Sequence, residues 1–466
     1  MPHKASYDTT DVEAHVKDTT STTSTTNTTT KRGLRGGFAI SLGAIVTLCL
    51  IIWALYADYP TDLGDSHVAQ YYFYLSGVLI MVFIGFGGLM TFLRRYALSA
   101  ITLNFGLSAM MMLGAVFCLG WAKQGFGHFI IDIPLLIDAT FCAAAGMITF
   151  GALIGFTTPT QLVYILAAEV PVYSANFYLL QHCIGAFDVG GSISIHAFGA
   201  FYGLAASYFL TRASKTSGPL HPKAGSQYMT DVTSMFGTLF LWIFWPSFNA
   251  ALASTGGEVV GGPTPHPQIF VIMNTLISLL GACVATFILS AALNDAIDMV
   301  HIQNATLSGG VAIGTAAALR VAPAATFGVG LLAGTLSTLG FQFLSPWVFK
   351  CKCLGIADTC CVLSLHGMPG VLGGLVSALF TGIYYSQNEG FFMEMGHSQG
   401  VQAGLQLAGL CATVGIALVT GAGVGYLCSV FRIEALSKSK SKTVMDDGED
   451  DLYEDAVMLR NVQKEE

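Results

Sequence analysis

Two stretches of this sequence share one pattern: Asp188-Val-Gly-Gly-Ser-Ile-Ser-Ile-His196 and Asp358-Thr-Cys-Cys-Val-Leu-Ser-Leu-His366. In each, an aspartate precedes a histidine by eight residues, and a glycine and a serine follow that histidine at seven and eleven residues. These followers are Gly203 and Ser207 in the first stretch, and Gly373 and Ser377 in the second. The repeated spacing indicates that one structural unit occurs twice in the chain.

The composition around both stretches is strongly apolar. Of the 466 residues, 53% are hydrophobic and 10% are charged, whereas ordinary globular domains carry about 25% charged residues. The mean hydropathy is +0.63, and the 53 glycines suit membrane helices whose backbones approach closely. A net charge of −8 offers no basic surface for nucleic acid. The composition therefore predicts a polytopic protein of the lipid bilayer.

Apolar runs long enough to cross a bilayer core of about 30 Å give the order of the expected helices. They lie at roughly 38–57, 71–92, 97–121, 133–156, 161–180, 188–211, 231–252, 268–292, 302–319, 324–349, 361–385 and 401–431. The two repeated stretches begin the sixth and the eleventh run, so their helices cross the bilayer in opposite directions. We therefore expect an all-α polytopic membrane protein of about twelve transmembrane helices, with a five-plus-five inverted repeat and a functional site near the middle of the membrane between the two halves.

The positive charges predict the orientation of this bundle. With both termini cytoplasmic, the inner segments hold most Lys and Arg residues, and the outer face keeps only Lys123 and Arg320. We expect residues 1–37 to form a disordered cytoplasmic tail, 38–431 the transmembrane domain, and 432–466 a charged cytoplasmic tail. A cytoskeletal or regulatory partner of these tails stays open, as does the choice between the plasma membrane and an organelle membrane.

The aspartates and histidines of the repeat predict different roles. Eight residues of helix rise about 12 Å, so each aspartate lies near one membrane face and each histidine lies well inside. Asp188 and Asp358 suit helix caps, because carboxylates accept hydrogen bonds from free N–H groups at a helix start; Asp188 could also draw a cation to the outer mouth. Intramembrane histidines are costly when charged, so His196 and His366 are expected as a neutral pair that shares a proton and offers polar atoms to a small guest.

Other polar residues carry weaker signals. Glu169 lies inside an expected span, and no role follows from its position. Cys351, Cys353, Cys360 and Cys361 cluster, but their spacing is not that of a zinc site. The sequence contains no His-Glu-x-x-His motif. We therefore expect no metal, no cofactor and no enzymatic activity.

Four longer motifs follow one another along the chain. They are the stretch from Asp188 through His196 to Ala200, Gly237-Thr-Leu-Phe-Leu-Trp-Ile-Phe-Trp-Pro-Ser-Phe-Asn249, Asp298-Met-Val-His-Ile-Gln-Asn-Ala-Thr-Leu-Ser-Gly-Gly310 and Leu365-His-Gly-Met-Pro-Gly370. Together they resemble the Rhesus-glycoprotein (Rh) branch of the ammonium transporter (Amt/Mep/Rh) family, over roughly residues 38–431. The resemblance implies a homotrimer in which each twelve-helix protomer has its own narrow, apolar pore.

The resemblance also assigns roles to single residues. His196 and His366 match the twin histidines of the pore, and Asp188 matches an aspartate below the outer mouth. Phe141 and Phe248 match a phenylalanine gate at the outer vestibule.

Asn249, which follows Phe248 directly, is expected beside the pore. On this reading ammonium loses a proton near the outer mouth, and neutral ammonia passes the histidines, so that the net transport is electroneutral. Carbon dioxide is a further cargo that the resemblance suggests. Two alternatives stay open: an electrogenic ammonium uniporter of the Amt type, and a non-conducting structural membrane partner.

Overall fold

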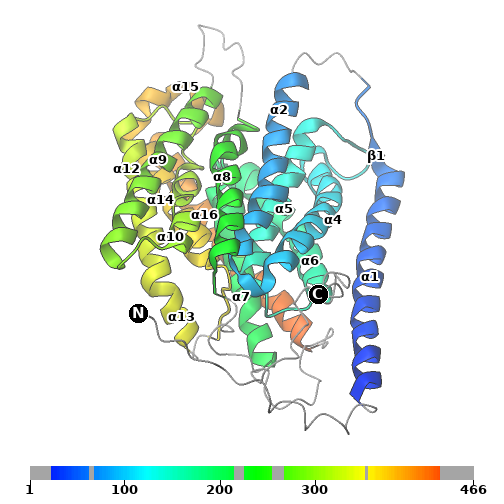
Figure 1. The fold of residues 1–466 in the computed structure, drawn as a ribbon. Coiled ribbons are helices and arrows are strands. Elements are labelled where there is room, and N and C mark those ends of the chain that lie inside the picture. Colours follow the sequence, from blue (N-terminus) through cyan, green and yellow to red (C-terminus); the bar gives the residue numbers. More distant parts are fainter. Residues whose placement is uncertain (1–22, 62–67, 215–224, 254–266, 352–354, 431–466) are drawn as a thin grey trace, which may run out of the picture.

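The computed structural model describes residues 23–61, 68–214, 225–253, 267–351 and 355–430. Its long helices run side by side in one bundle, with α1 set at the edge (Figure 1). The α-helices are α1 (Thr23–Tyr56), α2 (Val68–Leu79), α3 (Gly87–Leu89), α4 (Ala97–Gln124), α5 (Ile133–Leu153), α6 (Pro159–Tyr178), α7 (Phe198–Ser214), α8 (Tyr228–Ala250), α9 (Pro267–Leu293), α10 (Met299–Ala305), α11 (Ser308–Ile313), α12 (Pro323–Leu339), α13 (Ser345–Lys350), α14 (Met368–Tyr384), α15 (Glu389–Met395) and α16 (Gln399–Val430). Short π-helical segments extend several of them: η1 (Ile80–Phe86), η4 (Leu179–Ile184), η5 (Ser192–Ala197), η7 (Gly340–Leu344) and η8 (Leu363–Gly367). The described residues also contain three 3₁₀ turns: η2 (Met90–Phe92), η3 (Arg94–Tyr96) and η9 (Ser386–Asn388).

Ten helices in the described part of the chain are long and apolar enough to cross a membrane. They begin with Gly37–Tyr56 in α1 and end with Gln399–Val430 in α16. The other two expected crossings correspond to the less apolar α8 and to α10 with α11, which follow each other as one broken helix. The chain is therefore a multi-pass helical membrane protein, and its helices are consistent with the twelve crossings expected.

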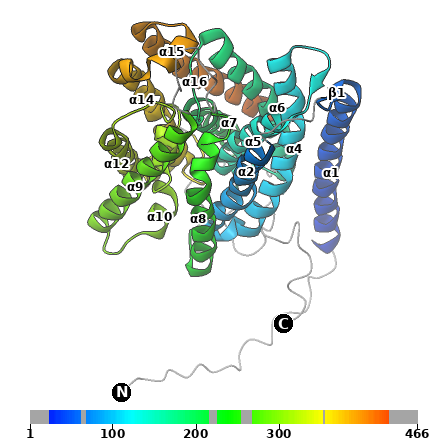
Figure 2. The same ribbon diagram turned by 90° about the horizontal axis from the view of Figure 1, so that it is seen from above.

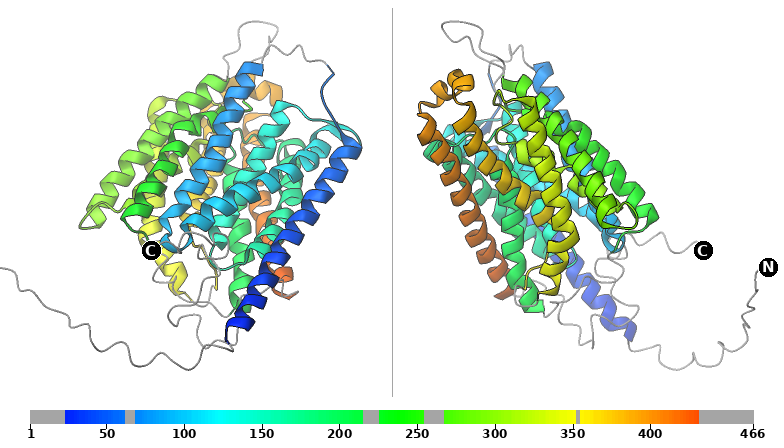
Figure 3. Two further views of the ribbon diagram at one scale, coloured as in Figure 1. Left: turned by 45° about the vertical axis from the view of Figure 1, so that its right-hand side comes forward. Right: turned by 90° about the vertical axis from the view of Figure 1, so that its left-hand side faces the viewer.

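The two halves of the bundle repeat one packing scheme. In the first half α4 packs against α6 and α5 against α7, and in the second half α9 packs against α12 and α11 against α14. The halves meet where η5 contacts α14 and η8 contacts α7. Figure 3 shows the long helices of the bundle side by side from two further directions. Helices α1 and α16 lie outside the repeat, which leaves five crossings in each half.

The centre and the edge of the bundle differ sharply in burial. In an apolar 18-residue window of the span Ile133–Leu153 in α5, 83% of the residues are buried, and the same holds for Ser192–Thr211, whereas the figure for the span in α1 is only 11%. Seen from above, α5 and α7 lie inside the ring of helices and α1 stands apart from it (Figure 2). Large apolar side chains on outer faces, such as Phe105 and Ile243, are more than half exposed. Lipid can cover such side chains, whereas soluble proteins rarely expose large apolar surfaces to water.

Close backbone contact brings α16 onto α7. A Cβ added at Gly421 would lie 2.3 Å from the carbonyl oxygen of Tyr202, and one added at Gly425 would lie 2.3 Å from that of Ala206. Small residues spaced four apart on one helix let two membrane helices approach in this way. The high glycine content of the sequence is used at such crossings.

Helix α1 differs from its expected course at its start. A disordered tail was expected up to residue 37, but the backbone is already helical from Thr23. A helix that has formed in the apolar span can extend toward the N-terminus at low cost, since only the first turn is expensive to form. After α1, strand β1 (Ala57–Asp58) pairs in parallel with β2 (Phe129–Ile130), the only β structure among the described residues. The expected tail 432–466 and residues 1–22 lie outside the described residues.

Candidate functional site

The two repeated histidines meet inside the bundle. The Nδ1 atoms of His196 and His366 lie 3.1 Å apart. Their rings are within 2° of parallel, with centroids 5.2 Å apart. Both side chains are buried, so the pair is shielded from bulk water.

The contact between these rings fixes the relation of their protons. A hydrogen bond between two Nδ1 atoms needs one ring that carries a proton there and one that does not. If both rings are neutral, the first then has a lone pair on Nε2 and the second has an N–H on Nε2. Nε2 of His196 is buried without a hydrogen-bond partner among the described residues. The pair can therefore present one donor and one acceptor to a small guest without bearing a net charge.

The same local turn positions each histidine. Gly191 donates its N–H to the carbonyl of Asp188 at 3.1 Å, and Cys361 donates to that of Asp358 at the same distance. Both residues have left-handed backbone, with φ of 70° at Gly191 and 55° at Cys361. The π-helical turns η5 and η8 begin just after these residues and carry the histidines. Such turns widen a helix locally and occur at functional sites.

The two aspartates cap these turns. Asp188 accepts hydrogen bonds from the N–H groups of Ile193 at 3.3 Å and Ser194 at 2.6 Å. Asp358 accepts from Val362 at 2.6 Å and from Leu363 at 3.0 Å. This is the capping arrangement that their positions predict, because carboxylate oxygens satisfy N–H groups that lack a partner at a helix start.

The Asp188 loop has further contacts with the second half. Thr315 Oγ1 donates to Asp188 Oδ1 at 2.5 Å, and Gly190 N–H donates to the Gly314 carbonyl at 2.9 Å. Asn249 lies behind this loop: a Cβ added at Gly190 would be 2.7 Å from its Oδ1. The amide Nδ2 of Asn249 donates to Thr275 Oγ1 at 3.0 Å. Asn249 thus supports the loop that carries Asp188.

A row of rings runs through the histidine pair. Phe141 and Phe248, the residues expected as a gate, have centroids 4.8 Å apart at 60°. Phe248 is 6.0 Å from His196, and His366 is 6.1 Å from Phe86. All of these side chains are buried. The order from the end of the bundle that contains Phe141 is two phenylalanines, two imidazoles and a third phenylalanine.

Each half of the repeat also braces the other half. Ser207 Oγ accepts a hydrogen bond from the N–H of Ala357, the residue before Asp358, at 2.9 Å. In the mirrored place, Ser377 Oγ accepts from Gln406 Nε2 at 3.0 Å. Gln406 of α16 in turn bonds both the N–H and the carbonyl of Phe187, the residue before Asp188, at 2.9 and 2.8 Å. The serine of one half therefore holds the aspartate loop of the other, directly in one case and through Gln406 in the other.

Glu169 is fully buried on α6, beside the first half of this arrangement. Thr149 Oγ1 lies 3.0 Å from both Glu169 Oε1 and the Gly199 carbonyl. Because Gly199 follows His196 by three residues, this contact supports the helix that carries the histidine. The hydrogen bond from Thr149 on α5 indicates a structural position for Glu169.

The cysteines form no metal centre in the described part of the chain. No group of three His, Cys, Asp or Glu side chains there could hold a metal ion. Cys360 and Cys361 are neighbours in the turn before η8, and Cys353 lies outside the described residues. Cys361 is part of the backbone turn that carries Asp358, since its N–H donates to the Asp358 carbonyl.

Sequence reasoning missed several supporting residues. Trp245 stacks on His196 with centroids 5.7 Å apart and planes 20° apart. Its position inside the Trp-Pro-Ser-Phe motif was the signal for it. Phe86 and Thr315 gave no local signal, because only the fold brings them to the site.

The repeat itself extends further than the two quoted stretches. The histidines are separated by 170 residues. The same interval relates Asn104 to Asn274 and Ser108 to Ser278, all of them buried. Testing that interval along the whole chain would have identified these pairs from the sequence.

These features define a helical membrane protein in which two inverted halves enclose a buried row of aromatic and imidazole rings. The model of the Ammonium Transporter Family matches residues 65–451. The chain belongs to this family of ammonium transporters.

Individual relatives agree with this assignment. The chain is 41% identical over 365 residues to Ammonium transporter Rh type B of Homo sapiens, covering 74% of this chain and 75% of the relative. It is 40% identical over 386 residues to the protein of the same name from Danio rerio, covering 79% and 80%. Among solved structures, it is similar to Nitrosomonas europaea Rh50, with a TM-score of 0.68 at 33% identity over 85% of this chain and 93% of that one. Saccharomyces cerevisiae Mep2 shares the fold, with a TM-score of 0.65 at 19% identity over 83% and 90%.

Proposed function

We propose that this protein conducts ammonia in neutral form along the row of rings from Phe141 to Phe86. The observation that carries the proposal is the contact of 3.1 Å between the Nδ1 atoms of two buried histidines. Such a pair offers a donor and an acceptor to ammonia, which can use both. The phenylalanines on either side add no polar partner, so the two imidazoles are the polar part of this row of rings.

The surroundings of the pair favour a neutral guest. An ion that leaves water for an apolar, buried passage loses its hydration, at a cost far above that of a neutral polar molecule. Ammonium can avoid this cost by losing a proton, which potassium and sodium cannot do. In the proposed cycle ammonium releases one proton to water at the outer end, and ammonia crosses. It then binds one proton from water at the inner end, so no net charge crosses.

The orientation and the assembly belong to the same proposal. The excess of Lys and Arg on one side supports cytoplasmic termini, which makes the end with Phe141, Phe248 and Asp188 the outer one. The membership of the family supports a homotrimer with one passage in each protomer. Phe141 and Phe248 then act as the outer gate.

Purified protein in proteoliposomes tests the proposal. Stopped-flow measurement with an internal pH dye is expected to show faster ammonia entry than in empty liposomes. His196→Ala and His366→Ala should each lower the flux strongly at equal protein content. His182→Ala is the matched control, because His182 lies near the end of η4 and contacts Tyr178, with ring centroids 4.9 Å apart and planes at 33°. Equal flux in wild type and both pair variants would contradict the proposal.

Electrical recording separates neutral from charged transport. An ammonia gradient at fixed ammonium should set the flux, and no current should accompany it. Currents that scale with ammonium at fixed ammonia would instead identify an electrogenic uniporter. Carbon dioxide is proposed as a second neutral cargo, and the same liposomes test it by acidification after mixing with bicarbonate buffer.

A further inference from the structure

The end of the row of rings at Phe86 depends on a short π-helical segment. Phe86 is the last residue of η1, and its ring centroid lies 6.1 Å from that of His366. A π-turn inserts one residue into an α-helix, so the residues on its two sides are rotated against each other by about 100° compared with a continuous α-helix. The direction in which Phe86 points relative to α2 therefore depends on η1 staying π-helical.

The side chain of Asn104 in α4 binds this segment. Its Nδ2 donates to the carbonyl of Val82 at 2.8 Å and lies 3.5 Å from the carbonyl of Phe83. Where a helix changes from the α to the π pattern, a backbone carbonyl loses its usual N–H partner four residues on. Asn104 is fully buried, and water does not replace such a partner inside an apolar bundle. The amide therefore supplies the donor that this backbone form needs.

Only the donor half of this amide is used. Oδ1 of Asn104 has no hydrogen-bond partner among the described residues, and a buried amide oxygen without a partner is costly. Asn274, which follows Asn104 by the same interval as the histidines, uses both halves. Its Nδ2 donates to the carbonyls of Ala317 and Leu319 at 2.9 Å each, and its Oδ1 accepts from Thr326 Oγ1 at 3.3 Å. The bond to η1 must therefore outweigh the cost of the unpaired oxygen at Asn104.

Helix α8 fixes the chain just after Phe86. A Cβ added at Gly88 would lie 2.9 Å from Gly237 Cα of α8, and the N–H and carbonyl groups of α3 thus pack directly on that helix. Ser234 of α8 also donates to the carbonyl of Leu89 at 2.7 Å. Because these contacts hold α3 in place, a change of η1 to an α-turn would move the residues of η1 itself, Phe86 included.

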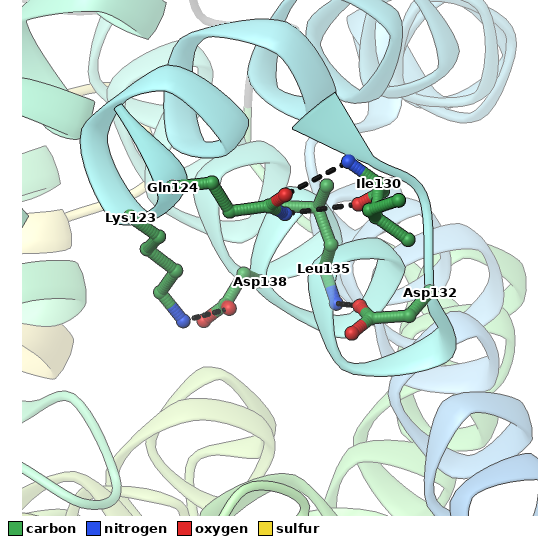
Figure 4. Close-up of polar contacts among 6 residues, drawn as sticks. All are labelled: Lys123, Gln124, Ile130, Asp132, Leu135 and Asp138. Atoms are coloured by element: carbon green, nitrogen blue, oxygen red, sulfur yellow. Dashed lines mark hydrogen bonds and ion pairs between the residues drawn. The ribbon is translucent and has the colours of Figure 1, made fainter. Parts of the chain in front are cut away.

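The far end of α4 is anchored as well. Gln124 accepts a hydrogen bond from the N–H of Ile130 at 2.8 Å and donates to its carbonyl at 2.9 Å. Lys123 forms an ion pair with Asp138 of α5. Figure 4 shows both contacts, which tie the end of α4 to the loop before α5 and to α5 itself. We therefore expect η1, and not α4, to move when the bond from Asn104 is lost.

We propose that Asn104 is a positioning residue for the passage, whose amide holds η1 in the π-helical form that keeps Phe86 beside His366. The inference rests on the proposed function, because it assigns to Asn104 the width of the passage at Phe86. Without the bond, η1 relaxes to an α-turn and the Phe86 ring leaves the row. The passage then becomes wider on that side of His366 and admits larger neutral amines.

Flux of ammonia and methylamine into proteoliposomes tests the proposal. An apolar site discriminates one methylene group by about 10- to 200-fold, so Asn104→Leu should raise the ratio of methylamine to ammonia flux by about tenfold. Phe86→Ala should raise the ratio similarly. Asn104→Leu should add nothing in that background, because Asn104 acts through this ring. Asn104→Ser has the same expected ratio and covers the case in which leucine does not fit beside Gly87, since a helical serine bonds its own backbone instead.

Asn274→Leu is the matched control. It removes the amide at the repeat-related position, together with two hydrogen bonds to the backbone after α11. It should therefore destabilise the protein at least as much as Asn104→Leu and leave the flux ratio unchanged. If Asn274→Leu raises the ratio equally, general loosening of the bundle and not the position of Phe86 sets the ratio, and the inference is wrong.

Fluorine NMR observes the ring without transport. The detergent-solubilised protein carries para-fluorophenylalanine in place of Phe86. In otherwise wild-type protein, His366→Ala should shift the fluorine signal, because the two rings are neighbours. In Asn104→Leu and Asn104→Ser the signal should lie elsewhere, and His366→Ala should no longer shift it.

The two measurements separate this inference from the proposed function. If wild-type protein does not conduct ammonia, the proposed function fails, and the fluorine signal still decides whether Asn104 positions Phe86. A fluorine signal that stays unchanged in both Asn104 variants overturns the inference. An unchanged flux ratio in conducting Asn104 variants overturns it too.

Discussion

Gly191 and Cys361 occupy the same place in two mirrored turns. Each lies three residues after the capping aspartate, donates its N–H to the carbonyl of that aspartate at 3.1 Å and has a left-handed backbone. Glycine adopts this conformation freely, whereas a residue with a side chain pays for it. The two halves thus use the same backbone with unequal strain.

Exchange of these residues should change stability in opposite directions. Cys361→Gly should raise the stability by about 1 kcal/mol, because it relieves the left-handed strain. Gly191→Cys should lower it, since a Cβ at Gly191 would also lie 2.3 Å from Ile195 Cδ1. Melting of the detergent-solubilised protein measures both. An equal loss in the two variants would mean that backbone strain is unimportant at Cys361.

The contact between His196 and His366 predicts that stability and transport can be separated. In His366→Asn the amide reaches the place of Nδ1, so the bond to His196 can persist, but no atom takes the place of Nε2. We expect this variant to melt above His366→Ala and yet to conduct ammonia as poorly. Melting and stopped-flow flux on the same preparation test this. Near wild-type flux in the asparagine variant would show that Nε2 of His366 is not needed.

The caps at Asp188 and Asp358 predict losses of stability. Asparagine can accept only through Oδ1, so one of the two N–H groups at each helix start loses its partner. Each Asp→Asn change should cost about 1–2 kcal/mol. If Asp188→Asn lowers ammonium uptake far more than Asp358→Asn at matched stability, Asp188 also attracts the cation. Equal effects on uptake would leave capping as its sole role.

The two hydrogen bonds between the Gln406 side chain and the Phe187 backbone predict a specific effect of Gln406→Leu. This change leaves a buried N–H and a buried carbonyl without partners, at about 1–3 kcal/mol each. The Asp188 loop should loosen, which hydrogen exchange of residues 185–191 would detect. Gln399→Leu, at the exposed start of the same helix, serves as control. Unchanged exchange in Gln406→Leu would argue against the brace.

The crossing of α7 and α16 predicts a contrast between two nearby glycines. Gly421→Ala should destabilise the protein by about 1–3 kcal/mol or more, because its Cβ meets the Tyr202 carbonyl. Gly423→Ala should be neutral or slightly stabilising, since no atom lies within 4 Å of a Cβ there. Thermal melting compares the two. Similar behaviour would mean that α16 can shift away from α7 at little cost.

Much of the fold could be predicted from the sequence because most segments that cross a bilayer must be long and apolar. The repeated stretches from Asp188 to His196 and from Asp358 to His366 predicted two related halves. They begin apolar runs that are an odd number of crossings apart, which predicted that the two halves have opposite directions in the membrane. The broken crossing of α10 and α11 was expected as one ordinary span, since its break at Thr306 and Leu307 has no Pro or charge to mark it. The early start of α1 at Thr23 was missed because threonine-rich sequence has low helix propensity.

The candidate site was predictable in part. The two histidines and the two aspartates stood out, because polar residues in apolar runs are rare and these repeat. Phe86, Thr315 and Gln406 could not be found in this way, since they reach the site through packing between distant helices. The ion pair between Lys123 and Asp138 also could not be predicted from the sequence, because only the folded loop between α4 and α5 brings the two side chains together.

The crossed bracing of the aspartate loops has a consequence for biogenesis. The loop with Asp188 leaves the ribosome early, but its partner Gln406 is synthesised more than two hundred residues later. After the first half has entered the membrane, the Asp188 loop therefore lacks this support until α16 has been synthesised and inserted. A chain truncated before α16 should insert its other helices but leave the Asp188 loop unsupported. The outer end of the passage should therefore form correctly only when α16 is present.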